Sequence, residues 1–204
     1  MGGYRVFPGG AADAAELQGV DLGGPVRRPL RARTMRRVPR SEANAQRAAR
    51  IAAAARAACR ELREEADLTV DPATLRHWAH WITPSGVWRR FDTHFFLAPA
   101  PSGQRPRLDE REASEWCWVP PHLHACDVDI NPEFPLTAPT QMVLREIAED
   151  VARLGSLEAL LASAPARSIR TVIPKMIGME FVVFPWGPRL PRPFRREQRL
   201  AAGS

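Results

Sequence analysis

The sequence predicts an α/β (α+β) fold, in which helices and strands share one core. An alanine-rich run without glycine or proline, residues 42–66, has the composition of a long helix. Aromatic stretches bounded by proline or glycine recur elsewhere, which is typical of strands. With 204 residues and 45% hydrophobic content, the chain can bury one sizeable core, so we expect a single domain over residues 1–188.

The N-terminal part predicts a strand, a glycine loop and an insertion. A short apolar stretch, residues 4–7, runs into Pro8-Gly9-Gly10, where the glycines permit backbone geometries closed to other residues. From residue 17 to residue 41, glycines and prolines interrupt a basic segment, so we expect an irregular insertion there, written 17–41. Ser41 is a suitable N-cap for the long helix that follows.

The middle of the chain predicts one short helix and two strands. Asp71-Pro72 followed by ATLRHWAHWI indicates a short capped helix or turn. Residues 90–98, RFDTHFFLA, have the composition of a core strand, and residues 113–119 resume an aromatic, strand-like pattern. A polar, proline-containing loop over residues 99–109 joins these two strands.

The C-terminal part predicts two helices, two short strands and a tail. Thr140 can cap a helix whose apolar positions are Met142, Val143, Ile147 and Val151. A second helix over residues 156–164 and strands at residues 172–174 and 180–184 should follow. Residues 189–204 are rich in arginine and proline, so we expect a disordered basic tail.

Charge and cysteine usage restrict the partners and the compartment. The net charge of +6 and a pI near 10.4 favour an anionic partner: a phosphorylated small molecule, a nucleic acid or a membrane surface. The three cysteines contain no CxxC pair, which argues against a disulfide framework and for a reducing cytoplasm. We find no apolar run near the roughly 20 residues that span a bilayer, so we expect a cytoplasmic protein without a membrane partner. The oligomeric state stays open.

Three glutamates near the end of the long helix form the first candidate site. Residues three and four apart share a helix face, so Glu61, Glu64 and Glu65 place three carboxylates in one small region. Such a group is either a solvated helix face or a site for a hard, oxygen-preferring cation such as Mg²⁺ or Mn²⁺. Spacing alone favours the solvated face, because glutamate-rich helices are common.

The wider sequence around these glutamates favours the cation site over the solvated helix face. RELREEADL, residues 60–68, resembles the second half of the Nudix box, REUxEExGU with U an aliphatic residue. The first half, Gly-x5-Glu, has its match in Gly10 and Glu16, and residues 17–59 stand where the box has only a short link. This split box, with HWITPSGVWRRFDTHFFLA and a later tryptophan before Val-Pro, resembles the branch of Nudix hydrolases that includes the animal peroxisomal coenzyme A diphosphatase.

The resemblance implies a fold, an activity and a substrate class. It implies a Nudix α/β/α sandwich with a mixed sheet and a long insertion inside the box. It also implies a pyrophosphohydrolase that cleaves a diphosphate linkage in a nucleoside-diphosphate derivative, with coenzyme A or acyl-coenzyme A as the preferred substrate. NADH, ADP-ribose and capped RNA are the alternative substrates.

The resemblance also assigns roles to residues. Glu61, Glu64 and Glu65 would bind Mg²⁺ or Mn²⁺. Arg60 would orient these glutamates, although a surface ion pair is the alternative for it. The proton acceptor would be a helix glutamate or a carboxylate outside the helix. The remaining members of the expected site are Glu112 and Glu115 as proton acceptors and Gly9, Gly10 and Glu16 in the cofactor-binding loop.

Two features depart from the family pattern. Asp67 stands where the box has glycine, at a position that ends the helix and often takes a left-handed backbone, which aspartate tolerates better than most residues. Nudix domains have strands before the glycine loop, whereas Met1 lies only a few residues ahead of it. We therefore expect the natural start to lie further upstream. A catalytically inactive Nudix-like protein is the corresponding alternative.

Other signals support weaker hypotheses. The basic segments 27–40 and 189–199 could neutralise phosphates, which makes an RNA-binding module the non-enzymatic alternative and nucleic acid the less favoured partner. A zinc site is a further alternative, with HxxH on a helix, HLH on a loop and the cysteines: His77, His80, His122, His124, Cys59, Cys117 and Cys126. The aromatic residues are expected in the core rather than in a pocket: Trp78, Trp81, Trp88, Phe95 and Phe96.

Overall fold

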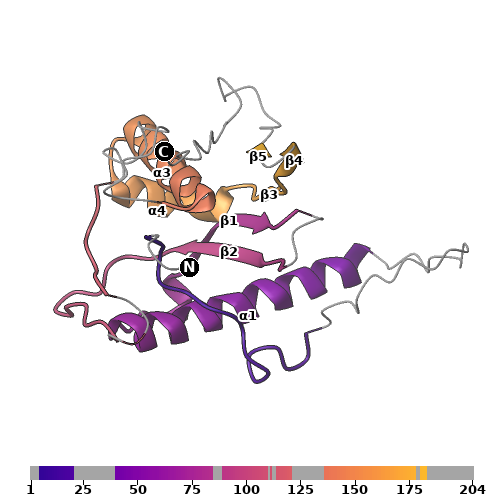
Figure 1. Ribbon diagram of the computed structural model, residues 1–204, viewed down its shortest axis with the longest axis horizontal. Coiled ribbons are helices and arrows are strands. Elements are labelled where there is room, and N and C mark those ends of the chain that lie inside the picture. The colour runs from indigo at the N-terminus through magenta and orange to yellow at the C-terminus, as the bar shows by residue number, and fades with distance from the viewer. Residues whose placement is uncertain are drawn as a thin grey trace, which may run out of the picture. The chain divides into compact units, whose positions relative to one another are not determined.

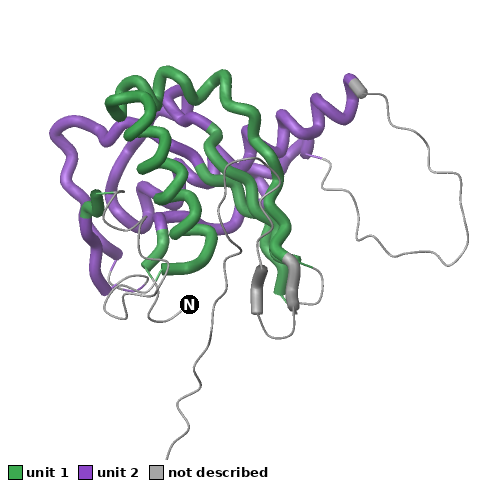
Figure 2. The backbone as a smooth tube through the Cα atoms, turned by 90° about the horizontal axis from the view of Figure 1, so that it is seen from above, with its two compact units in different colours: residues 1–6, 77–95, 118–204 green, residues 7–76, 96–117 purple. Residues whose placement is uncertain are grey.

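The computed structural model describes residues 5–20, 40–84, 89–109, 111, 114–120, 136–177 and 180–182. Two compact units divide the chain (Figure 2): unit 1 comprises residues 1–6, 77–95 and 118–204, and unit 2 comprises residues 7–76 and 96–117. The expected single domain over residues 1–188 stays a prediction. Most of the basic insertion, from residue 21 to residue 39, and the tail from residue 189 lie outside the described residues.

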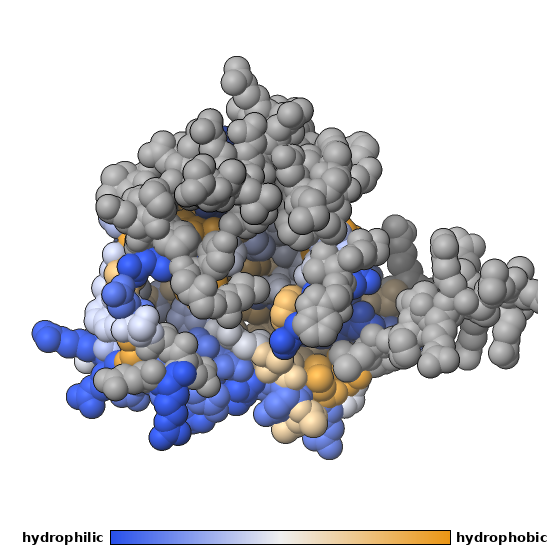
Figure 3. Space-filling view, viewed as in Figure 1, coloured by the Kyte–Doolittle hydropathy of each residue, from blue (hydrophilic) through white to orange (hydrophobic). Residues whose placement is uncertain are grey.

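Unit 2 is dominated by the long helix α1, Arg40–Ala66 (Figure 1). The predicted helix is confirmed, but it begins at Arg40, so Ser41 is a helical residue rather than the N-cap. Among its alanines, Ala53, Ala57 and Ala66 are buried. On the face drawn in Figure 3, hydrophilic residues gather at the lower left, and hydrophobic residues lie to the right of them. The helix therefore buries small apolar residues and keeps charged side chains in water.

The end of α1 is fixed by a left-handed residue and by a returning loop. Asp67 has φ 54°, and its N–H donates to the Arg63 carbonyl over 3.0 Å, which is the αL type of helix ending. In the predicted polar loop, the Arg107 N–H donates to the Ala66 carbonyl over 2.9 Å and the Asp109 N–H to the Glu65 carbonyl over 3.2 Å. These bonds satisfy carbonyls that a helix end leaves without partners, and so they hold the last turn of α1 in place.

The short helix predicted after Asp71 is confirmed only over its first turn. Pro72–Thr74 forms the 3₁₀ helix η1, and the Asp71 carboxylate accepts a 2.9 Å hydrogen bond from the Ala73 N–H. The following segment, Arg76–Ile82, is strand β1 and not helix. Strands on both sides satisfy its backbone hydrogen bonds, and this pairing decides between helix and strand where local sequence does not.

Unit 1 contains a small mixed sheet in the order β2-β1-β3. Strand β2, Asp92–Leu97, confirms the predicted strand with shorter bounds, but its residues are exposed or half-buried, so the predicted core position is not confirmed. Strand β3, Thr171–Val172, lies parallel to β1 with His80 opposite Thr171. A separate antiparallel pair is formed by β4, Lys175–Ile177, which was not predicted, and β5, Glu180–Val182.

Two helices complete unit 1 and lie side by side in Figure 1: α3, Ala138–Leu154, and α4, Leu157–Ser163. A further 3₁₀ turn, η2, Ala164–Ala166, follows them. Thr140 is not the cap of α3: Thr137 takes that position, and Thr140 is buried in the first turn, where its hydroxyl lies 2.8 Å from that of Thr137. The predicted apolar face is confirmed at its centre, where Val143 and Ile147 are buried.

The predicted helix over residues 156–164 is confirmed by α4. The Ser156 hydroxyl caps it by accepting from the Ala159 N–H over 3.1 Å. Leu160 of α4 and Trp78 of β1 are the largest fully buried side chains among the described residues. Every helix that the structure describes is too short or too polar to cross a membrane.

Two predicted strands are wrong within the described residues. The segment before the glycine loop makes only a single bridge, between Arg5 and Leu136. Residues 114–119 form no strand, and their tryptophans Trp116 and Trp118 are 47% and 66% exposed. An alternating aromatic pattern becomes a strand only where another strand is available to pair with it. Helices with a small mixed sheet nevertheless confirm the predicted α+β class.

Candidate functional site

Arg60 is the centre of a polar cluster in unit 2. Its Nε donates to Glu16 Oε1 over 3.0 Å, and its Nη1 donates to both Glu61 Oε1 and Glu64 Oε2 over 2.9 Å. Its Nη2 donates to the Ala11 carbonyl over 2.9 Å. Glu64 is reached because residues four apart share a helix face, whereas Glu16 and Ala11 come from the glycine loop. One guanidinium therefore joins the two distant halves of the motif.

Glu16 anchors the loop to the helix. Its side chain is 10% exposed, and its Oε2 accepts a 2.8 Å hydrogen bond from the Asp13 N–H. In return, the Glu16 N–H donates to Asp13 Oδ1 over 2.9 Å, and Arg56 Nη2 donates to the Glu16 carbonyl over 2.6 Å. The hydrogen bond with Glu16 raises the pKa of Arg60 above its ordinary value, so the guanidinium remains charged. The buried Glu16 carboxylate therefore has the charged partner and the hydrogen bonds that a buried charge needs.

The glycine loop passes directly over the helix glutamates. The Gly9 N–H donates to Glu65 Oε2 over 2.9 Å. A Cβ at Gly10 would overlap with Glu61 Oε1, so a side chain there would displace the carboxylate. Glycine therefore leaves room for the end of the Glu61 side chain beside the loop backbone. The loop and the helix therefore form one arrangement, in which Glu61 is 13% exposed and Glu64 is 50% exposed.

The cluster carries more negative than positive charge. Arg60 contacts Glu16, Glu61 and Glu64, and Asp13 Oδ2 lies 3.8 Å from its Nε. One guanidinium facing four carboxylates leaves a surplus of oxygen ligands, which suits a hard divalent cation. In the structure the three helix glutamates are held separately, Glu65 by the loop and the other two by Arg60. The donor set fits such an ion, and binding would require these oxygens to turn toward it.

The two proposed proton acceptors outside the helix, Glu112 and Glu115, stay predictions as members of this cluster. Glu112 lies outside the described residues. Glu115 is exposed in the segment that follows. The identity of the general base therefore stays a prediction.

The histidines take positions that the sequence did not predict. His77 and His80 lie on strand β1 rather than on a helix, and His122 and His124 lie outside the described residues. His80 and His94 of β2 stack with ring centroids 4.1 Å apart. Asp92 and His94 were missed as possible ligands. Their spacing of two residues was the available signal, since alternate residues of a strand share a face.

The aromatic residues of β1 belong to the core, as predicted. Trp78 is 1% exposed and Trp81 is 5% exposed. The guanidinium of Arg167 lies 3.9 Å from the centre of the Trp78 ring, a cation–π contact. Trp88 lies outside the described residues.

Comparisons with known proteins give a match to a family model. The NUDIX domain family model matches residues 52–135, less than half of the chain. No curated protein and no solved structure gives a match. The matched range contains Arg60 to Glu65, whereas Gly9, Gly10 and Glu16 precede it, so their contacts with the helix are an independent observation. The match supports the Nudix superfamily for this chain and indicates a hydrolase that acts on phosphorus-containing anhydrides.

Proposed function

We propose that the protein is a metal-dependent pyrophosphohydrolase that cleaves the diphosphate linkage of coenzyme A or an acyl-coenzyme A. The coarser activity, pyrophosphate hydrolysis in nucleoside-diphosphate derivatives, has the support of the NUDIX match. The observation that carries the proposal is the contact between the two halves of the motif. Glu16 and Ala11 of the loop meet Arg60, and Gly9 meets Glu65.

The helix carboxylates supply the chemistry in this proposal. Glu61, Glu64 and Glu65 would hold Mg²⁺ or Mn²⁺, which would supply positive charge for the diphosphate oxygens and make water a better nucleophile. Arg60 fixes the directions of Glu61 and Glu64 through two 2.9 Å hydrogen bonds. Gly10 leaves room for Glu61 beside the loop backbone.

The proton from water goes to a carboxylate in or beside this cluster. Of the two helix glutamates that Arg60 holds, Glu64 is half exposed and Glu61 is nearly buried, so Glu64 is the more open to a substrate. Glu112 and Glu115 are the alternatives from outside the helix. A glutamine at the correct position removes the base and preserves the shape, so glutamine variants of these residues can be separated by the pH dependence of kcat.

The substrate choice rests on the split box and on charge. The insertion inside the box resembles the coenzyme A diphosphatase branch, and the net charge of +6 suits a substrate that carries several phosphates. NADH, ADP-ribose and capped RNA are the competing substrates. The cytoplasmic location stays a prediction.

A screen of diphosphate compounds with Mg²⁺ and Mn²⁺ tests the proposal. Wild type is compared with Glu64→Gln and Glu65→Gln, with Glu42→Gln at the opposite end of the same helix as the matched control. We expect hydrolysis of coenzyme A by wild type and the control, and a loss of about 10²-fold or more in kcat for the two site variants. Equal hydrolysis by all four proteins would exclude the glutamate site.

The same screen addresses the alternatives. Hydrolysis of another diphosphate with the same dependence on Glu64 and Glu65 would keep the site and change the substrate. Absence of hydrolysis, together with an RNA affinity that falls steeply with salt, would instead support the RNA-binding module.

A further inference from the structure

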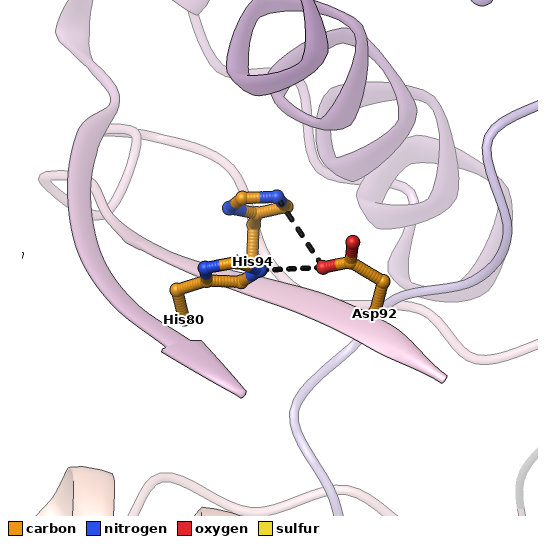
Figure 4. Close-up of side chains that lie close together, drawn as sticks. All are labelled: His80, Asp92 and His94. Atoms are coloured by element: carbon orange, nitrogen blue, oxygen red, sulfur yellow. Dashed lines mark hydrogen bonds and ion pairs between the residues drawn. The ribbon is translucent and has the colours of Figure 1, made fainter. Parts of the chain in front are cut away.

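We propose a second metal site in unit 1, formed by His80, Asp92 and His94, that binds a borderline divalent ion such as Zn²⁺. Figure 4 shows both imidazole rings directed at the Asp92 carboxylate, with His80 from β1 and the other two residues from β2. One potential ligand atom from each residue lies within 4.8 Å of the others. Among the described residues, these three form a group of histidine and acidic side chains close enough to hold one metal ion. The ligands differ from those proposed for diphosphate hydrolysis.

The outer nitrogen of each ring is already engaged. His80 Nδ1 lies 2.8 Å from Thr171 Oγ1 on the parallel strand β3, and His94 Nδ1 lies 3.0 Å from His77 Nε2. When Nδ1 of a neutral imidazole donates a hydrogen bond, its Nε2 carries the lone pair. This is the tautomer that metal-binding histidines adopt, fixed by a partner behind the ring.

The inner nitrogens both face one carboxylate oxygen. His80 Nε2 lies 2.5 Å from Asp92 Oδ1, and His94 Nε2 lies 3.7 Å from the same oxygen. If both Nδ1 atoms donate, two inner lone pairs face the anionic oxygen; if the Thr171 hydroxyl instead donates to His80 Nδ1, the neutral ring donates its Nε2–H to Asp92. In the first arrangement a metal ion between the three groups supplies the missing positive charge, whereas in the second the hydrogen bond replaces it.

The chemistry of the three ligands selects the ion. Two imidazole nitrogens and one carboxylate suit Zn²⁺, Co²⁺ or Ni²⁺, whereas Mg²⁺ prefers an all-oxygen set such as the helix glutamates. The histidine side chains are 14% and 12% exposed, so they are largely shielded from water, while Asp92 is 56% exposed. Three protein ligands leave at least one position of a tetrahedral ion open to water.

Binding requires a small local movement. The His80 and His94 rings are nearly parallel, with an interplanar angle of 4°, and an ion cannot lie in the plane of both while they stack. The rings must splay apart, and the Asp92 carboxylate must withdraw from its 2.5 Å contact. Asp92 can move because its side chain is more than half exposed. Loss of the stacked arrangement is therefore an expected mark of binding.

The test is a Co²⁺ and Zn²⁺ titration of the full chain, followed by visible absorption and by imidazole NMR signals. Wild type is compared with His94→Gln and Asp92→Asn, with Glu64→Gln and the pair His122→Ala and His124→Ala as controls. We expect wild type and both controls to bind one nitrogen-ligated ion that Zn²⁺ displaces. We expect His94→Gln and Asp92→Asn to lose at least about 10-fold in affinity.

A variant of a positioning residue distinguishes loss of the metal site from misfolding. Thr171→Val removes the hydroxyl behind His80 and keeps the shape of the side chain. We expect it to fold like wild type by circular dichroism and to weaken Zn²⁺ binding by about 10-fold. Retention of the nitrogen-ligated ion in Asp92→Asn and His94→Gln, or its loss in the His122 and His124 variant, would overturn the site. So would an unchanged wild-type spectrum with imidazole signals that respond only to pH.

Discussion

Two polar clusters, one on a helix and one on a sheet, differ in the groups that pair with their carboxylates. Around Arg60, a permanently charged guanidinium joins carboxylates from α1 and from the glycine loop. Around Asp92, two imidazoles face one carboxylate, and their further partners come from β1 and β3. The first cluster is held together by its own fixed cation, whereas the hydrogen bonds of the second depend on the histidine tautomers.

Arg60 provides the largest expected effect. Arg60→Ala leaves the Glu16 carboxylate, 10% exposed, without its main partner and frees the two helix glutamates. We expect a loss of about 2–3 kcal/mol in the free energy of unfolding and of about 10²–10³-fold in kcat/KM. Urea denaturation and diphosphate hydrolysis measure these effects.

Arg63→Ala, nearby on the same helix, is the matched control and should cost little. Arg60→Lys should recover only part of the loss, since an ammonium cannot reproduce the planar, multiply bonded geometry. If Arg60→Ala matched the control in both measurements, the fixed-cation description of the helix cluster would be wrong.

Substitution of Gly10 has the next largest expected effect, on kcat/KM. In Gly10→Ala the new Cβ would overlap with Glu61 Oε1, so the carboxylate or the loop must move. We expect kcat/KM to fall by about 10–10²-fold while the protein stays folded, because a small displacement of a catalytic group is costly to rate. Ala14→Ser, at an exposed position of the same loop, is the control. Unchanged kinetics of Gly10→Ala would show that the loop does not position Glu61.

Asp67 tests the end of the helix that carries the site. Its φ of 54° lies in the left-handed region, where glycine is unstrained and β-branched residues are not. We expect Asp67→Gly to raise the free energy of unfolding by up to about 1 kcal/mol and Asp67→Val to lower it by about 1 kcal/mol or more. Thermal denaturation measures both. A valine variant as stable as the glycine variant would contradict the helix ending described above.

Substitution of Glu146, an ion-pair partner of Arg167, has the smallest expected effect on stability. Arg167 Nη2 donates to Glu146 Oε2 over 2.6 Å and Nη1 donates to Asp150 Oδ2 over 2.8 Å, but burial still raises the pKa of Glu146 above its ordinary 4.5. A raised carboxyl pKa means that protonation favours the folded state. Its stabilising contribution is therefore present below about pH 4.5 and is lost as pH rises through the folded-state pKa.

Glu146→Gln cannot titrate and should remove this pH dependence. We expect the Tm of wild type, relative to Glu146→Gln, to fall slightly between about pH 4.5 and pH 7. A relative rise over the same range would mean that the ion pair with Arg167 outweighs burial. In that case Arg167 would act on its carboxylates as Arg60 does.

The sequence predicted the helix cluster better than the sheet cluster for a physical reason. Helical spacing is local, so Glu61, Glu64 and Glu65 can be placed on one face without knowledge of any partner. Sheet contacts join distant segments, and the stack of His80 on His94 depends on which strands pair. The same reason explains why Arg76–Ile82 was expected to be helix or turn.

By itself, the sequence determined the long helix, the residues of the split motif and the left-handed position at Asp67. These depend on local propensity and on patterns of a few residues. Only the tertiary structure decided that Glu16 and Gly9 meet Arg60 and Glu65 across the insertion, because such contacts depend on how distant segments of the chain pack. It also decided that β1 is a strand and that Asp92 faces two histidines, since backbone pairing and side-chain contacts between strands are not encoded in any one segment.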